Sequence, residues 1–340
     1  MKKFISIIFC ILFVSISLPI SSFANDNNIG FTIQPELPKN QKDKKVSYFD
    51  LRMKPKQQQT IYVRISNTSN KDGTFRFRVN QAYTNKSGFI DYAEDNTQKD
   101  ESLRYDTKSI ISYKSQVRVK AKSVKKVPIK IKMPAEKYDG QILAGIQVMK
   151  EDDSDSKKES IKNQYGYILG LRLTETDESV RREIKLVDVK PAVSFARTSV
   201  VAKLQNPTMD AIGHLKYKAI VTNRETDKVV KTVSYDKDMQ MAPNSTYDFA
   251  IDWDKKPLEA GDYRIDLTVS DAKNNKWNLK ENFTITEAAA KEVNQVAIGE
   301  VPDQNNWLKW IIIGGVIVLA LIILLVIWYR KKNSPHQTRR

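Results

Sequence analysis

Thr60-Ile-Tyr-Val-Arg-Ile65 alternates β-branched apolar residues with larger polar ones, and Thr74-Phe-Arg-Phe-Arg-Val79 repeats the alternation a few residues later. Successive side chains of an extended strand point to opposite faces, so this period of two places the apolar side chains on one face. β-Branched and aromatic residues also favour strands. Both stretches therefore predict β-strands with one buried face.

Strand-like sequence extends over most of the chain. Further strands are predicted at 48–53, 117–121, 127–132 and 142–149, and a second series at 165–173, 183–189, 199–204, 214–221, 229–235, 246–252, 262–269 and 277–285. Pro, Gly, Asn and Asp separate them, and no stretch before residue 287 keeps a helical period. Short strands at this spacing predict an all-β fold with two tandem immunoglobulin-like β-sandwich domains.

A charged, serine-rich stretch divides the two series. It predicts a linker at 151–162 between an N-terminal sandwich at 29–150 and a C-terminal sandwich at 163–287, followed by a stalk at 288–306 that is briefly helical. The acidic residues of the linker lack the glycine and the closing glutamate of a calcium loop, so we predict no metal site there.

The two halves resemble each other. Ile61-Tyr-Val-Arg-Ile-Ser-Asn-Thr-Ser69 parallels Val200-Val-Ala-Lys-Leu-Gln-Asn-Pro-Thr208, because in both an alternating strand ends at an asparagine, Asn67 or Asn206. An asparagine side chain can hydrogen-bond to the backbone of a following turn. We therefore expect two copies of one sandwich plan.

The chain ends predict export and a membrane anchor. Residues 1–24 have the positive start, apolar middle and small residues of a signal peptide cleaved between Ala24 and Asn25. Residues 307–329 include an uncharged apolar run of 18 residues, 311–328, with aromatic residues at both edges, which predicts a transmembrane helix. The basic tail at 330–340 predicts a cytoplasmic C-terminus, with the preceding residues outside a single-pass cell membrane protein.

Charge and cysteine content limit the function. The formal charge is +16, and +9 remains for residues 25–329 after the signal and the tail are removed. A basic exported protein is expected to meet anionic wall polymers, lipids or acidic proteins and no nucleic acid. The single cysteine, Cys10, lies in the signal, so the mature chain has no disulfide or thiolate metal site.

Few residues are suited to catalysis. The two histidines are His214, on a predicted strand, and His336, in the tail, and no phosphate loop or zinc spacing occurs. We therefore predict a non-enzymatic binding protein without cofactor or metal. Two alternatives remain: a cell-wall-active enzyme that uses paired carboxylates, and a surface receptor that lacks a catalytic tail.

Two stretches are candidates for polymer binding. The loop at 82–92 offers Tyr83 and Tyr92 as stacking faces, with Asn85 and Asp91 as polar partners. The basic stretch at 118–132 includes Arg118, Lys120 and Lys122, which an anionic polymer would contact electrostatically. Hairpin packing alone also explains the first stretch, and a solvated face or a lysine-guarded strand edge also explains the second.

Several short motifs resemble the WxL-interacting protein family of low-GC Gram-positive bacteria. They are Asn40-Gln41, Tyr48-Phe-Asp-Leu51, Pro55, Gln59-Thr-Ile-Tyr-Val63, Asn67, Ala82-Tyr-Thr-Asn85, Gly88-Phe-Ile-Asp-Tyr92, Gly140-Gln-Ile-Leu-Ala-Gly145, Leu204-Gln-Asn-Pro207, Met241-Ala-Pro-Asn-Ser245 and 258–263. The resemblance covers about residues 29–287, and Ala144 stands where the family commonly has glycine. It implies an N-terminal peptidoglycan-binding domain and a C-terminal domain that binds WxL surface proteins or a host extracellular-matrix protein.

Overall fold

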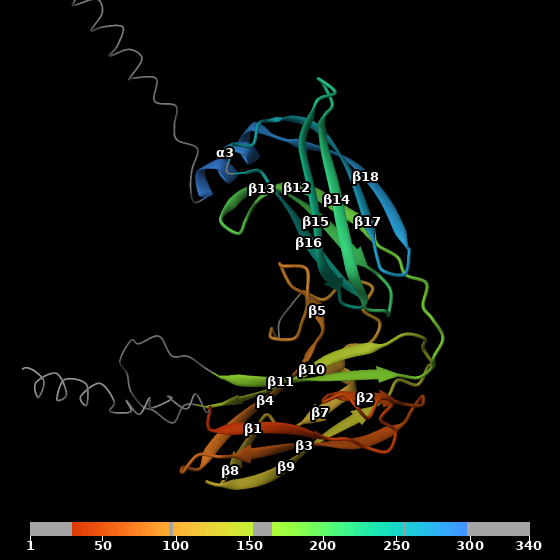
Figure 1. Cartoon of the computed structure of the whole chain (residues 1–340), viewed down its shortest axis with the longest axis vertical. Helices are drawn as coiled ribbons and strands as arrows, with labels where there is room; N and C mark the ends of the chain where they lie inside the picture. The colour runs from red at the N-terminus through yellow and green to blue at the C-terminus, as the bar shows by residue number, and fades with distance from the viewer. Residues whose placement is uncertain (1–28, 95–97, 152–164, 255, 298–340) are drawn as a thin grey trace, which may run out of the picture. The chain divides into compact units, whose positions relative to one another are not determined.

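The structure is a computed structural model that describes residues 29–94, 98–151, 165–254 and 256–297 (Figure 1). These residues form two compact units. Unit 1 contains the described parts of residues 1–82, 92–97 and 105–178, and unit 2 contains 83–91, 98–104 and the described residues from 179 onward. The predicted signal peptide, the transmembrane helix, the tail and nearly all of the linker lie outside the described residues. Within the described ranges, no helix is both long and apolar enough to span a bilayer.

Unit 1 consists of two packed sheets (Figure 1). The first has the order β1 (Phe31–Glu36), β3 (Gln58–Asn67), β9 (Ser123–Lys132) and β7 (Ile111–Tyr113). The second has the order β2 (Phe49–Arg52), β11 (Gly166–Thr174), β10 (Ile142–Lys150), β4 (Gly73–Gln81) and β8 (Gln116–Val119). A four-residue helix, α2 (Thr107–Ile110), precedes β7.

Unit 2 repeats this layering. One sheet has the order β12 (Lys185–Ser194), β13 (Arg197–Asn206) and β16 (Ser245–Asp252). The other has the order β15 (Val229–Met241), β14 (Ile212–Asn223), β17 (Gly261–Ser270) and β18 (Lys276–Ile285). A short hairpin of β5 (Tyr83–Thr84) and β6 (Ile90–Asp91) and a helix, α3 (Glu287–Val296), complete the unit.

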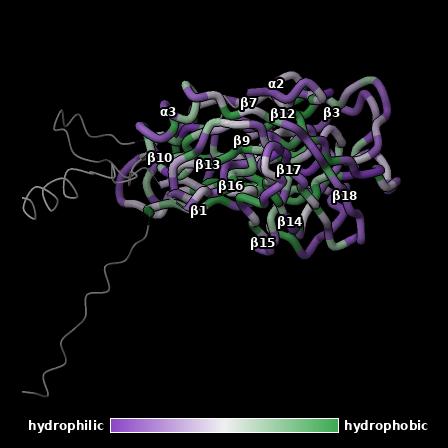
Figure 2. The backbone as a smooth tube through the Cα atoms, turned by 90° about the horizontal axis from the view of Figure 1, so that it is seen from above, coloured by the Kyte–Doolittle hydropathy of each residue, from purple (hydrophilic) through white to green (hydrophobic). Residues whose placement is uncertain are grey.

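The alternation in the sequence explains the two cores. Ile61, Val63 and Ile65 of β3 are buried while Tyr62 and Arg64 between them are exposed. β4 of unit 1 and β17 of unit 2 show the same alternation, and Figure 2 shows apolar and polar residues intermixed along the backbone. Each sheet thus buries one face against its partner sheet, and the hydrophobic effect holds the layers together.

The two units share one plan, as the internal likeness predicts. The order β1-β3-β9 of unit 1 corresponds to β12-β13-β16 of unit 2, and β8-β4-β10-β11 corresponds to β15-β14-β17-β18. Asn67 and Asn206 end equivalent strands and are buried. The Asn67 amide donates to the carbonyls of Lys71 (2.9 Å) and Val119 (3.1 Å), and the Asn206 amide donates to those of Asp210 (2.8 Å) and Ala242 (2.9 Å).

The compact units of the structure differ from the predicted domains in three places. Residues 83–91 and 98–104, expected in the N-terminal sandwich at 29–150, belong to unit 2. The strand expected at 165–173 in the second domain is β11, which lies in unit 1, between β10 and β2. The first half of the predicted stalk is α3, which begins at the N-cap Thr286 and buries Ala290 and Val293 in the core of unit 2. These differences have the same origin, because a local pattern shows that a face is apolar but not what covers it.

Candidate functional site

The outer face of the β10–β11 pair in unit 1 has an unusual floor. Gly145 and Gly170 lie directly opposite each other in the antiparallel register of these strands. A Cβ at Gly145 would lie 2.4 Å from the Cβ of Tyr92, and one at Gly170 would lie 3.5 Å from the Cβ of Tyr48. Glycine within a strand often marks close approach of another group. Here the missing side chain of Gly145 lets Tyr92 lie against the sheet, whereas a Cβ at Gly170 would make only an ordinary contact with Tyr48.

A hollow of about 430 Å³ opens beside these tyrosines. Its residues come from four separate segments of unit 1: Ser47, Tyr48, Tyr92, Gln141, Leu143, Ile168, Leu169, Gly170, Leu171 and Arg172. Tyr48 is 36% exposed, so its ring is available to a ligand. None of these residues is Asp or Glu.

Several polar atoms beneath this face have no hydrogen-bond partner among the described residues. They are Asp50 Oδ1, Asn80 Oδ1, Gln147 Oε1 and Arg172 Nε. Arg172 Nε lies 3.8 Å from Asp50 Oδ1, close enough for charge attraction but too far for a hydrogen bond. A buried polar atom without a partner costs about 1–3 kcal/mol. The outer face is therefore less completely satisfied than a purely structural surface.

The hollow has the composition of a carbohydrate-binding site. Aromatic rings offer an apolar face for stacking, and a few polar groups fix the orientation of the ligand. Gln141 and Ser47 can hydrogen-bond to hydroxyl or amide groups, and Arg172 can pair with a carboxylate. The arrangement supports binding, and its lining offers no acid pair for hydrolysis.

The structure separates the residues predicted in the loop at 82–92. Tyr92 lines the hollow of unit 1, whereas Tyr83, Asn85 and Asp91 belong to the β5–β6 hairpin of unit 2. The Asn85 amide donates to Asp91 Oδ2 (3.1 Å), and its carbonyl accepts from the backbone N–H of Phe89 (3.1 Å). Asn85 and Asp91 thus hold the hairpin turn, as the alternative of hairpin packing expects.

The predicted basic residues lie together near the β8–β9 turn of unit 1. A second hollow, of about 460 Å³, includes Arg118 and Lys120 in its lining. Arg118 lies 3.5 Å from Asp72, and the ammonium group of Lys122 donates to the carbonyl of Thr68 (2.7 Å). Lys122 has φ = 50° and so forms part of the turn itself. These contacts occupy two of the three predicted cations in local structure.

Sequence reasoning missed Tyr48, Gln141 and Arg172 as site residues. A signal was present, because Gly145 and Gly170 each interrupt a strand pattern, which indicates a bulge or a close approach. Nothing in the local sequence shows that the two glycines face each other, since their register depends on the pairing of β10 with β11.

The comparisons with known proteins also divide the chain into two successive domains, with boundaries that differ from those of the two compact units. A family model described as "WxL Interacting Protein, peptidoglycan binding domain" matches residues 31–150, and one described as "WxL Interacting Protein, host binding domain" matches residues 156–295. The second range includes β11, which the structure places in unit 1. A search of curated proteins gives no match.

Solved structures with a related course of the chain include several fimbrial chaperones. One comes from a chaperone–tip adhesin complex of CFA/I fimbriae biogenesis (8% identity, TM-score 0.32, covering 75% of this chain and 97% of that chain). Others are the class 5 fimbriae chaperone CfaA (10%, 0.29, 74% and 98%) and the Pseudomonas aeruginosa CupB2 chaperone (15%, 0.26, 67% and 92%). At TM-scores this low the likeness supports no conclusion about fold or function.

The family matches rest on different ground, because they follow the sequence over most of its length and in the order of the two domains. The chain belongs to the WxL-interacting protein family.

Proposed function

We propose that this protein is a membrane-anchored scaffold on the cell surface that binds peptidoglycan through unit 1 and a protein through unit 2. The observation that carries the proposal is the hollow beside Tyr48 and Tyr92. Its lining residues between 47 and 143 lie in the range matched by the peptidoglycan-binding model, and those at 168–172 lie in the range matched by the host-binding model. Stacked rings and a few polar groups suit an amino-sugar polymer that also carries carboxylates. The protein partner is a WxL surface protein or a host matrix protein.

The anchor is the transmembrane helix predicted at 307–329, with residues 25–306 outside the cell and residues 330–340 in the cytoplasm. This topology is tested by adding protease to intact, wall-stripped cells. We expect cleavage within residues 25–306 and protection of the tail. Cleavage of the tail alone would overturn the topology.

Wall binding is tested by co-sedimentation of the full-length chain with purified peptidoglycan. We expect Tyr48→Ala and Tyr92→Ala each to weaken binding about five- to tenfold, because each removes one stacking face. Tyr62→Ala is the matched control, since Tyr62 is 40% exposed on β3 in the other sheet of unit 1. Equal binding by all three variants would reject this hollow as the wall-binding site.

A further inference from the structure

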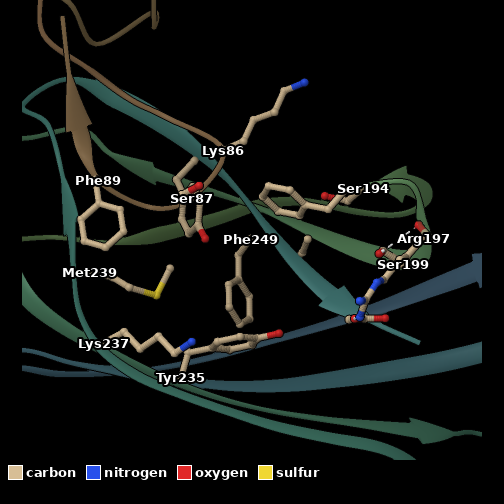
Figure 3. Close-up of a pocket in the computed structure, with 14 residues that line it drawn as sticks. Lys86, Ser87, Phe89, Ser194, Arg197, Ser199, Tyr235, Lys237, Met239 and Phe249 are labelled. Atoms are coloured by element: carbon tan, nitrogen blue, oxygen red, sulfur yellow. Dashed lines mark hydrogen bonds and ion pairs between the residues drawn. The ribbon is translucent and has the colours of Figure 1, made fainter. Parts of the chain in front are cut away.

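Unit 2 has a hollow of its own, of about 470 Å³, which the proposed function does not assign (Figure 3). It lies between β15 and β16, which are the end strands of their respective sheets. The tip of the β5–β6 hairpin, the β12–β13 turn and the start of β13 (Arg197 and Ser199) supply the rest of its lining. All these segments belong to unit 2.

The pattern of lining residues shows how the hollow runs. From β16 it takes Tyr247 and Phe249, which face the core, and also Ala250 and Asp252, which alternate with core residues. Residues from both faces of one strand line the same space where that space passes around the backbone edge or the end of the strand. β16 pairs with β13 on its other side, and within the described residues no strand pairs with the edge that borders the hollow.

The walls opposite β16 are apolar. Tyr235 and Met239 of β15 and Phe89 of the hairpin border the space beside Phe249 (Figure 3). Phe89 is 39% exposed, and Phe195 in the β12–β13 turn is 65% exposed. Exposed aromatic side chains beside an unpaired strand edge are typical of a surface that receives another chain.

The hairpin closes one end of the hollow. The backbone N–H of Gln240 donates to the carbonyl of Gly88 (2.7 Å), and the hydroxyls of Thr84 and Ser245 are 2.7 Å apart. Gly88 has φ = 77°, and a Cβ there would lie 2.3 Å from Met239 Cε. The free length of β16 therefore runs from Tyr247 to Asp252, enough for about six extended residues, or roughly 20 Å.

The charges at the rim favour an acidic ligand. Lys86 and Lys237 line the hollow and have no ion-pair partner among the residues that the structure describes. The third cation, Arg197, is already paired with Asp252 at 2.6 Å. Two unpaired lysines beside an apolar groove attract carboxylates and repel basic segments.

We infer that the open edge of β16 binds an extended, acidic segment of a partner protein as an added β-strand, with apolar side chains at alternate positions. Backbone hydrogen bonds to β16 supply affinity, and the aromatic walls select the alternating apolar side chains. Lys86 and Lys237 favour Asp or Glu at the positions of the bound segment that alternate with its apolar side chains. The inference rests on the proposed function only in that unit 2 binds protein.

The test uses the full-length chain and a dye-labelled, end-capped peptide of sequence Glu-Val-Glu-Phe-Glu-Val, followed by fluorescence anisotropy. We expect saturable binding that weakens about tenfold or more for Lys-Val-Lys-Phe-Lys-Val, which has the same pattern with opposite charge. We expect a similar loss for Glu-Glu-Glu-Val-Phe-Val, which has the same composition without the alternation.

Substitutions inside and outside the hollow test whether the peptide binds along β16. Ala250→Glu adds bulk and negative charge in the groove and is expected to weaken binding about tenfold or more, whereas Ala250→Lys adds similar bulk with the favourable charge and is expected to stay within about threefold of wild type. Lys237→Glu is expected to cost about fivefold, and Lys276→Glu, the same change on β18 outside the groove, less than about twofold.

Three results would overturn the inference. They are no saturable binding of the acidic alternating peptide, equal binding of the block-ordered peptide, or unchanged binding to Ala250→Glu. A concentration-dependent dimer of the free chain that Ala250→Glu abolishes would instead assign the groove to a second copy. Co-sedimentation of the same variants with peptidoglycan separates the two proposals, because wall binding is expected to stay unchanged whether or not the peptide binds.

Discussion

The corresponding outer faces of the two sandwiches differ sharply in how well their polar groups are satisfied. In unit 2 the outer face of β17–β18 is a network in which Asp266 contacts Arg264 (3.0 Å) and Lys280 (3.2 Å). Burial alone would raise the pKa of Asp266, but the hydrogen bonds from these two cations outweigh it and lower the pKa. In unit 1 the face of β10–β11 has two glycines, two tyrosines and buried polar atoms that have no hydrogen-bond partner among the residues the structure describes.

The difference shows where one plan acquires separate functions. Both units use the same strand order and the same buried asparagine, so these features belong to the fold. The face of β17–β18 carries ion pairs, whereas the face of β10–β11 carries the partly exposed Tyr48 and the hollow beside it. In unit 2 the unsatisfied feature is instead the edge of β16. The proposed ligand surface therefore lies on a sheet face in unit 1 and along a sheet edge in unit 2.

The largest expected effect is a loss of stability when the buried asparagine that both units share is replaced. We expect Asn67→Ala and Asn206→Ala each to lower the free energy of unfolding of its unit by about 3 kcal/mol, because several backbone groups lose their partner. Urea unfolding can be followed separately in the two units, because the first tryptophan in the sequence is Trp253 and unit 1 therefore contains no tryptophan. Tryptophan fluorescence should therefore follow Asn206→Ala, and far-UV circular dichroism alone should detect Asn67→Ala. Unequal losses would show that the two asparagines are not equivalent.

Substitutions at Gly145 and Gly170 test at which position the absence of a side chain is needed for the packing of a tyrosine. Gly145→Ala places a Cβ at 2.4 Å from Tyr92 Cβ and 2.9 Å from Ile168 Cγ2, so Tyr92 must move. We expect a loss of about 2 kcal/mol in stability and about tenfold in peptidoglycan binding. Gly170→Ala is the matched control, because its nearest contact of 3.5 Å is ordinary. Co-sedimentation and thermal melting measure both, and equal effects of the two variants would contradict the proposed packing of Tyr92.

A buried ion pair gives unit 2 an acid-sensitive stability. Asp271 contacts Arg182 at 2.7 Å and its side chain is fully buried. Burial would raise the pKa of Asp271, but hydrogen bonds from Asn275, Arg182 and Lys273 together lower it. The stabilisation is therefore present above the unfolded pKa of about 4 and lost as the pH falls through the lower folded value.

We expect Asp271→Asn to destabilise unit 2 by about 1–3 kcal/mol at pH 7, with a difference that shrinks below pH 4. Urea unfolding followed by tryptophan fluorescence at pH 7, 5 and 3 measures it. Asp236→Asn is the control, since the pair of Asp236 and Lys216 is mostly exposed. A difference that is constant from pH 7 to pH 3 would contradict the assignment.

The smallest expected effect is on peptidoglycan binding when a basic residue near the β8–β9 turn of unit 1 is replaced. Lys120→Gln is expected to weaken peptidoglycan binding less than about twofold at 0.15 M salt, because an exposed charge is screened. Co-sedimentation at 0.02 M and 0.15 M salt tests this, with Lys276→Gln of unit 2 as the control. A tenfold loss would place the wall-binding site at the β8–β9 turn instead of at the tyrosines.

Much of the fold could be predicted from the sequence, but few of the residues that line either hollow could. The faces of β3 and β4 follow from alternation. Trp277 of β18 and Trp253, which follows β16, pack against the core of unit 2. Of the seven predicted polymer-binding residues, only Tyr92 lines the tyrosine hollow. Its partner Tyr48 lies 44 positions earlier in the chain, and no sequence pattern connects them.

The sequence by itself determined the strands, their buried faces, the doubling of the plan and the family, because each of these depends on neighbouring residues or on the order of motifs. Tertiary structure decided that β11 completes unit 1, that the hairpin at 83–91 belongs to unit 2, and which side chains border each hollow. The physical reason is that alternation fixes which way a side chain points. The identity of the group that it meets depends on the pairing of strands distant in sequence.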